Sequence, residues 1–189
     1  ITIPSSVTEI GKGAFQGCSG LIDITIPNTV TTIGNWTFSD CTSLTSVSIP
    51  DGVTEIGYEA FFCCYSLTNI TIPNTVTSIG DSAFECCHSL TSITIPAGIT
   101  SIGESTFEDC TGLISVTIPD SVTVIGQEAF YRCEKLTSIT IPSSVTEIGY
   151  EAFWGCSNLA DIYVNQTEST LLDNADVPDD CRIHWNESV

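Results

Sequence analysis

The fold is decided by a 23-residue unit, which over residues 90–112 reads LTSITIPAGITSIGESTFEDCTG. Its residue types return along most of the chain, because proline, glycine, phenylalanine, leucine and cysteine each recur every 23 positions. The recurring phenylalanines are Phe15, Phe38, Phe61, Phe84, Phe107, Phe130 and Phe153, and the recurring cysteines are Cys18, Cys41, Cys64, Cys87, Cys110, Cys133 and Cys156. Self-similarity at a fixed period is the signature of a repeat architecture. We therefore predict a stack of seven equivalent coils.

Each unit begins with a short strand. Ile93 and Ile95 alternate with polar residues, which is the two-residue period of a strand with one buried face. Pro96 ends the strand, because proline has no backbone N–H for a ladder and fixes its own φ angle. A second extended piece follows, as in residues 7–10, and ends at Gly11.

The second half of the unit is predicted to form one turn of helix. In residues 80–87, the apolar Ala83, Phe84 and Cys87 lie at positions i, i+1 and i+4, on one side of a helical turn. A coil this short cannot enclose its own apolar side chains, so neighbouring coils must cover each other. Equivalent residues of successive coils are then expected about 4.8 Å apart, which turns every column of the repeat into a ladder.

The unit, L-x-x-I-x-I-P-x-x-V-T-x-I-G-x-x-A-F-x-x-C, resembles the leucine-rich repeats of the BspA-like family, found on surface proteins of mucosal bacteria and some protozoan parasites. The resemblance covers residues 1–164, with mild departures such as Ile99, Thr37 and Thr106. It implies an α/β repeat fold, a right-handed curved solenoid with a parallel sheet on the concave side. It also implies a role in adhesion and in binding host proteins.

The period is lost after residue 164, and residues 165–189 are predicted to form a C-terminal cap over the last coil. Residues 169–175 are expected to be a short helix with Ser169 or Thr170 at its N-cap. Residues 181–185 have the pattern of one more strand. The first coil has no comparable segment before it, so we expect it to be exposed.

The charge balance excludes one class of partner. The chain of 189 residues has 4 Lys and Arg against 23 Asp and Glu, which gives a net charge of −19. Nucleic acids are held by clustered Lys and Arg that neutralise phosphates, and the basic residues here are scattered. An anionic bilayer surface is disfavoured for the same reason, and no apolar run is long enough to span a membrane.

Ten cysteines invite a disulfide framework or a metal site, but their spacing favours neither. Seven share one inward-facing column, where free cysteine serves as a small hydrophobic residue. Cys63 and Cys86 occupy an exposed-side position in consecutive coils, so a bridge between them stays open, and Cys181 has no evident mate. Zinc bound by a set of Cys63, Cys64, Cys86, Cys87 and His88 is disfavoured, because Cys64 and Cys87 belong to the inward-facing column.

The sequence offers few candidate catalytic residues, and we predict that the protein is not an enzyme and needs no cofactor. No Ser or Cys is placed by the repeat to be activated by His88 or His184, the two imidazoles of the chain. Four carboxylates do converge on adjacent coils, and they form either a solvated acidic face or a weak Ca²⁺ site. These residues are Asp81, Glu85, Glu104 and Glu108.

Two surfaces are candidates for binding a partner. The first is the polar side of the strands, because curved solenoids use their concave sides as docking faces; its residues are Ser46, Ser48, Asn69, Thr71, Ser92, Thr94, Ser115, Thr117, Ser138, Thr140 and Tyr163. The second comprises aromatic clusters in the other half of the unit, since exposed aromatics supply rigid contact area; its residues are Tyr58, Phe62, Tyr65, Tyr131, Tyr150 and Trp154. A further column, Thr in all seven coils from Thr8 to Thr146, is expected to satisfy backbone groups at a bend.

These observations favour a non-enzymatic, extracellular or surface-attached recognition and adhesion module that binds host or other cell-surface proteins. One alternative is a glycan-binding module that uses the exposed aromatics. Another is a structural spacer for a neighbouring domain. We expect a monomer without nucleic-acid binding or membrane insertion.

Overall fold

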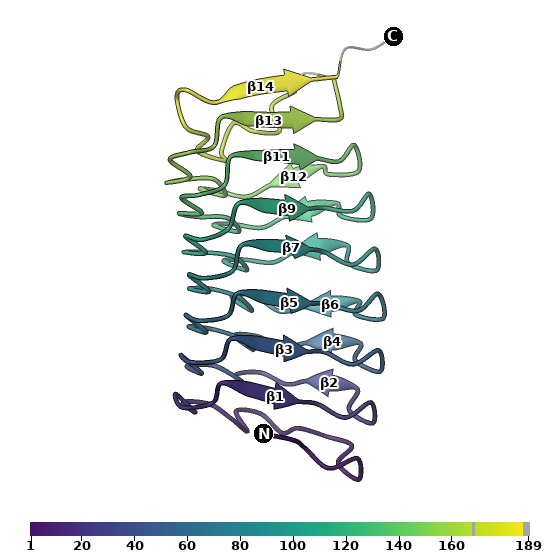
Figure 1. The fold of residues 1–189 in the computed structure, drawn as a ribbon. Coiled ribbons are helices and arrows are strands. Elements are labelled where there is room, and N and C mark those ends of the chain that lie inside the picture. The colour runs from purple at the N-terminus through teal and green to yellow at the C-terminus, as the bar shows by residue number, and fades with distance from the viewer. Residues whose placement is uncertain (168, 187–189) are drawn as a thin grey trace.

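The computed structural model describes residues 1–167 and 169–186 and shows a parallel-strand solenoid. The coils lie one above another along a single axis, with the first coil at one end and the C-terminal segment at the other (Figure 1). Each complete coil places one strand on the front and, from the second coil onward, a shorter strand on the back. The predicted stack is confirmed.

The front ladder consists of eight parallel strands. In sequence order they are β1 (Asp23–Thr25), β3 (Ser46–Ser48), β5 (Asn69–Thr71), β7 (Ser92–Thr94), β9 (Ser115–Thr117), β11 (Ser138–Ile141), β13 (Asp161–Val164) and β14 (Arg182–Trp185). The hydrogen-bonded sets are β1-β3-β5, β7-β9 and β11-β13-β14. Ile24 pairs with Val47, one full repeat later, and the repeat thereby sets the register. The last step is shorter, because Ile162 pairs with Ile183.

The back ladder consists of two-residue parallel strands. They are β2 (Thr32–Ile33), β4 (Glu55–Ile56), β6 (Ser78–Ile79), β8 (Ser101–Ile102), β10 (Val124–Ile125) and β12 (Glu147–Ile148). A glycine follows each strand, and from Gly57 onward the coils approach closely there. A Cβ atom on Gly149 would lie 2.3 Å from the backbone nitrogen of Gln127, whereas a Cβ on Gly11, in the first coil, would meet nothing within 4 Å.

The predicted helical turn is wrong, because this part of the coil forms a third hydrogen-bonded ladder. Alternate N–H groups donate to the next coil and the intervening ones close turns within their own coil, whereas a helix would keep them all within one segment. In the fourth coil the intercoil pairs are Ser82 N to Glu104 O, Phe84 N to Thr106 O and Cys86 N to Glu108 O. Ser82 and Cys86 have φ angles of 54° and 60°, in the left-handed region.

The phenylalanine column forms the centre of the core. Each ring stacks on the ring of the next coil, with centroids 5.3 to 5.7 Å apart. All rings from Phe38 to Phe153 are fully buried, whereas Phe15 in the first coil is partly exposed. The expectation that equivalent residues lie directly over one another is confirmed.

The cysteine column contributes more than apolar volume. From Cys41 to Cys156, each thiol donates to the carbonyl oxygen of the phenylalanine 26 residues earlier, at sulfur–oxygen distances of 3.1 to 3.3 Å. Burial raises the pKa of Cys41 to about 11 and that of Cys156 to about 12. These thiols therefore stay neutral and bind the coils together, a role that the sequence pattern does not reveal.

The remaining cysteines are free thiols. Cys63 is not on an exposed side as predicted, because only 6% of it is accessible, and Cys86 is partly buried. No disulfide joins them in the structure. Cys18 is exposed although it belongs to the inward column, because it lies in the first coil.

The C-terminal segment continues the stack in an irregular form. The predicted helix is wrong, because residues 171–174 form a turn. The carbonyl groups at the end of this turn accept hydrogen bonds from the last complete coil. Glu151 N donates to Asn174 O at 2.9 Å, and Phe153 N donates to Ala175 O at 2.8 Å. The strand β14 lies where the sequence predicts a strand. Residues 168 and 187–189 of the predicted cap lie outside the described residues.

Candidate binding surfaces

The outward side of the front ladder, which we call the strand face, is a polar surface that runs along the stack. Strand residues alternate between exposed and buried, as in β3, where Val47 is buried between two exposed serines. The structure exposes every residue that the sequence places on this face: Ser46, Ser48, Asn69, Thr71, Ser92, Thr94, Ser115, Thr117, Ser138, Thr140 and Tyr163. Parallel pairing in register sets them in regular rows.

The hydroxyl groups of the strand face differ from other hydroxyl groups of the repeat. Within the described residues, no Ser or Thr of the strand face makes a side-chain hydrogen bond. The column of Thr at the back bend behaves oppositely: Thr54 Oγ1 donates to Thr31 O at 3.4 Å, and Thr146 Oγ1 donates to Thr123 O at 3.2 Å. The predicted backbone role of that column is confirmed for Thr54, Thr77, Thr123 and Thr146. The hydroxyls of the strand face remain available to water or to a partner.

The predicted aromatic clusters are organised along columns and not within single coils. Tyr131 stacks on Trp154 with centroids 4.7 Å apart, and Tyr65 stacks on His88 at 4.9 Å. Tyr58 meets the ring of Trp36 edge-on at 5.4 Å, while Phe62 is partly buried. Tyr150 is the most exposed member. These three pairs therefore each join two coils, which the repeat spacing would have revealed.

A lysine of the chain itself lies over the indole ring of Trp36, in the second coil. The ammonium of Lys12 lies 4.2 Å from the ring centroid of Trp36. Trp36 also donates its indole N–H to a carboxylate oxygen of Glu59 at 3.1 Å. A cation over an indole face is attracted by the ring quadrupole.

A charged cluster that the sequence does not predict ends the strand face. Asp161 accepts a hydrogen bond from Arg182 and pairs with His184, both at 2.7 Å, and Tyr163 stacks on the His184 ring at 4.6 Å. The His184 and Arg182 side chains lower the pKa of Asp161. The cluster escapes the repeat pattern because the step from β13 to β14 is 21 residues.

The four carboxylates considered for Ca²⁺ do not form a metal site in the structure. Within the part of the chain that is described, no group of three or more His, Cys, Asp or Glu residues is arranged to hold a metal ion. Asp81 Oδ1 instead accepts a hydrogen bond from the backbone N–H of Glu104 at 3.0 Å. Burial, and then the charges of neighbouring carboxylates, raise the pKa of Glu85 and Glu108. On the same side, Asp109 and Arg132 form an ion pair with nitrogen and oxygen 3.4 Å apart.

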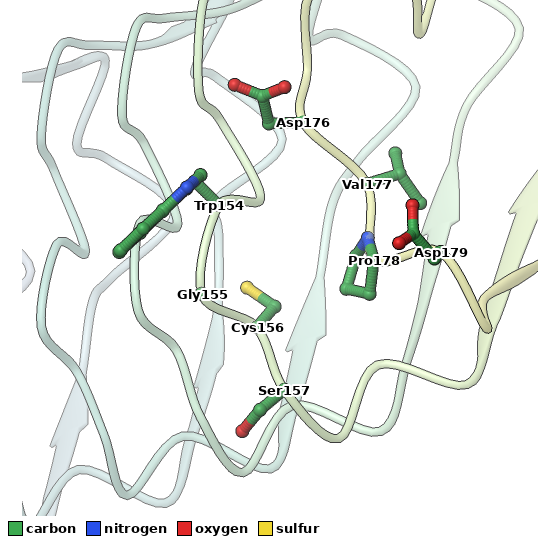
Figure 2. Close-up of a pocket in the computed structure, with 8 residues that line it drawn as sticks. All are labelled: Trp154, Gly155, Cys156, Ser157, Asp176, Val177, Pro178 and Asp179. Atoms are coloured by element: carbon green, nitrogen blue, oxygen red, sulfur yellow. The ribbon is translucent and has the colours of Figure 1, made fainter.

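An open pocket lies between the last complete coil and the C-terminal segment (Figure 2). Its volume is about 280 Å³. Residues 154–157 line the side formed by the coil, and residues 176–179 line the opposite side. Figure 2 shows Trp154 across the pocket from Pro178 and Asp179, with the Asp176 carboxylate at one end.

The geometry defines a leucine-rich-repeat solenoid, and the comparison with protein families identifies which kind. The family described as "BspA type Leucine rich repeat region" matches residues 1–113 and 77–175, in six copies. The chain belongs to this family. The comparison with curated proteins found no match.

Solved bacterial structures resemble the chain in fold. A leucine-rich cell surface protein from Faecalibacterium prausnitzii A2-165 is 41% identical over 86% of this chain and 46% of its own, with a TM-score of 0.78. A leucine-rich repeat protein from Bacteroides ovatus is 33% identical over 98% of this chain and 51% of its own (TM-score 0.74). The leucine-rich repeat protein of T. pallidum is 33% identical over 84% of this chain and 77% of its own (TM-score 0.81). The chain thus spans about half the length of the first two proteins.

The described residues contain no helix with the length and apolar character needed to cross a membrane.

Proposed function

We propose that this chain is a non-enzymatic recognition module at the cell surface, which binds host or partner proteins through the strand face. One observation carries the proposal: a continuous row of exposed hydroxyls makes no side-chain hydrogen bond within the described residues. Polar groups held by a rigid scaffold can exchange hydrogen bonds to water for bonds to a partner without breaking any bond within the chain. The similar cell surface protein of F. prausnitzii supports the location.

The imidazoles support the non-enzymatic part of the proposal. His184 pairs with Asp161 and stacks on Tyr163, and His88 stacks on Tyr65. Neither imidazole has a hydroxyl or thiol hydrogen-bond partner in residues 1–167 and 169–186. A nucleophile needs such a base within reach.

The test is binding of the intact chain to immobilised extracellular-matrix proteins, with collagen and laminin as the probes. The variant Thr94→Arg with Thr117→Arg places two large cations at the centre of the strand face, at exposed positions where the fold tolerates them. We expect this variant to lose binding. The matched control is Ser78→Arg with Ser101→Arg at exposed positions of β6 and β8 on the back ladder, which should bind as the unmodified chain does.

Equal loss in both variants would show a charge effect and not a docking face. Absence of binding by the unmodified chain would contradict the proposal and favour the role of a structural spacer.

A further inference from the structure

The pocket beside Trp154 combines a small volume with an aromatic wall. Pockets for drug-sized ligands enclose roughly 300 to 1,000 Å³, and this pocket encloses about 280 Å³. It therefore fits a single side chain or a small group. Trp154 is 46% exposed and is held from behind by its stack on Tyr131. The indole is thus preorganised and accessible.

Two carboxylates make the pocket suitable for a cation. Asp176 and Asp179 are exposed, and neither forms an ion pair within the described residues. The hydrogen bond and charge of Glu151 raise the pKa of nearby Tyr150, and the charge of Asp176 adds to this effect. The surroundings of the pocket are therefore negative.

The chain contains one cation–π contact that serves as a model for this pocket. At the other end of the stack, the Lys12 ammonium lies over the indole of Trp36, beside the carboxylate of Glu59. Trp154 lines a pocket together with the carboxylates of Asp176 and Asp179, but no Lys or Arg of the described chain lies over its ring. The nearby Arg132 is engaged with Asp109 and Glu134.

We propose that this pocket binds an arginine side chain of a partner protein, with the guanidinium over Trp154 and paired with Asp176 and Asp179. Arginine fits better than lysine, because its planar guanidinium stacks on aromatic rings and donates two parallel hydrogen bonds to a carboxylate. A neutral sugar would leave both carboxylates without a counter-ion. The inference rests on the proposed function, since it specifies one feature of the protein that is recognised.

The experiment follows the indole N–H resonances of Trp36, Trp154 and Trp185 in NMR spectra of the intact chain. The probe is N-acetyl-arginine amide, and its uncharged counterpart is N-acetyl-citrulline amide. We expect the arginine probe to shift the Trp154 resonance selectively, with a dissociation constant of about 10 mM or tighter. The citrulline probe should bind about tenfold more weakly.

Two isosteric variants separate the pocket from the general acidity of the surface. Asp179→Asn should weaken binding of the arginine probe several-fold. Glu147→Gln removes the same charge from the exposed back strand β12 and should leave binding unchanged. Both side chains are exposed, so neither change threatens the fold.

Several results would overturn the proposal. They are equal shifts of all three indole resonances, no shift, equal affinity for arginine and citrulline, or equal loss in the two variants. Selective binding of methyl mannoside at Trp154 would identify a glycan site instead. The strand-face variant Thr94→Arg with Thr117→Arg should bind the arginine probe normally, so that failure of the proposed function and failure of this site are distinguishable.

Discussion

Replacing Phe107 by alanine tests the column of stacked rings at the centre of the solenoid. Phe107 is fully buried between Phe84 and Phe130, with ring centroids 5.6 and 5.5 Å away. Removing a buried phenylalanine costs about 3 to 5 kcal/mol in lost burial and cavity formation. The two stacked pairs place Phe107 in the upper half of that range, at roughly 4 kcal/mol.

Phe15 provides the matched control at the end of the same column. It stacks on one ring only, Phe38 at 5.5 Å, and it is partly exposed. We expect Phe15→Ala to cost about half as much, roughly 2 kcal/mol.

The assay is urea denaturation followed by circular dichroism. With an m-value of about 2 to 3 kcal/mol per molar, the Phe107 variant should shift the midpoint by about 1.5 M. A cost below about 1 kcal/mol for Phe107, or equal costs for the two variants, would refute the reasoning that each coil is stabilised chiefly by rings above and below it.

Three further predictions follow from burial and contact. A thiol reagent should label Cys18 first among the cysteines of the inward column, because it alone of these is exposed; labelling of Cys87 before unfolding, detected by mass spectrometry, would contradict this. Glu85→Gln should raise the melting temperature at pH ~7 and not at pH ~4, because a raised pKa means that the folded state favours the protonated form, a contribution present at low pH and lost as the pH rises; an equal effect at both pH values would exclude this cause. Gly149→Ala should cost about 1 to 3 kcal/mol by forcing the backbone of the preceding coil aside, whereas Gly11→Ala should cost less than about 1 kcal/mol; equal melting temperatures of these two variants would be the contrary result.

The sequence predicts the strands more accurately than the turns. The alternation around Ile93 identifies β7, because the two-residue period has one structural explanation at that length. The spacing of Ala83, Phe84 and Cys87 misleads, because an inward-facing group at i, i+1 and i+4 suits a helical turn and also the ladder between coils. Only the hydrogen-bond partners distinguish a helical turn from the ladder, and half of these partners lie in the next coil.

Some of the candidate surfaces can be predicted from the sequence, and others cannot. Exposure of Thr94 and its equivalents follows from strand alternation, so the sequence predicts the strand face. The cluster around Asp161 and the pocket beside Trp154 depend on how the last segment returns to the stack. No repeat spacing encodes that return, and these features are seen in the structure alone.

The columns can be predicted from the sequence, because a constant repeat length makes every coil return to the same angular position. The contacts that each column makes are seen in three dimensions alone. The column thiols donate to carbonyl oxygens 26 residues earlier, the bend threonines bond the coil before them, and the strand-face hydroxyls stay without such partners. The physical reason is that a hydrogen bond depends on the distance and angle between atoms of different coils, which a one-dimensional period does not specify.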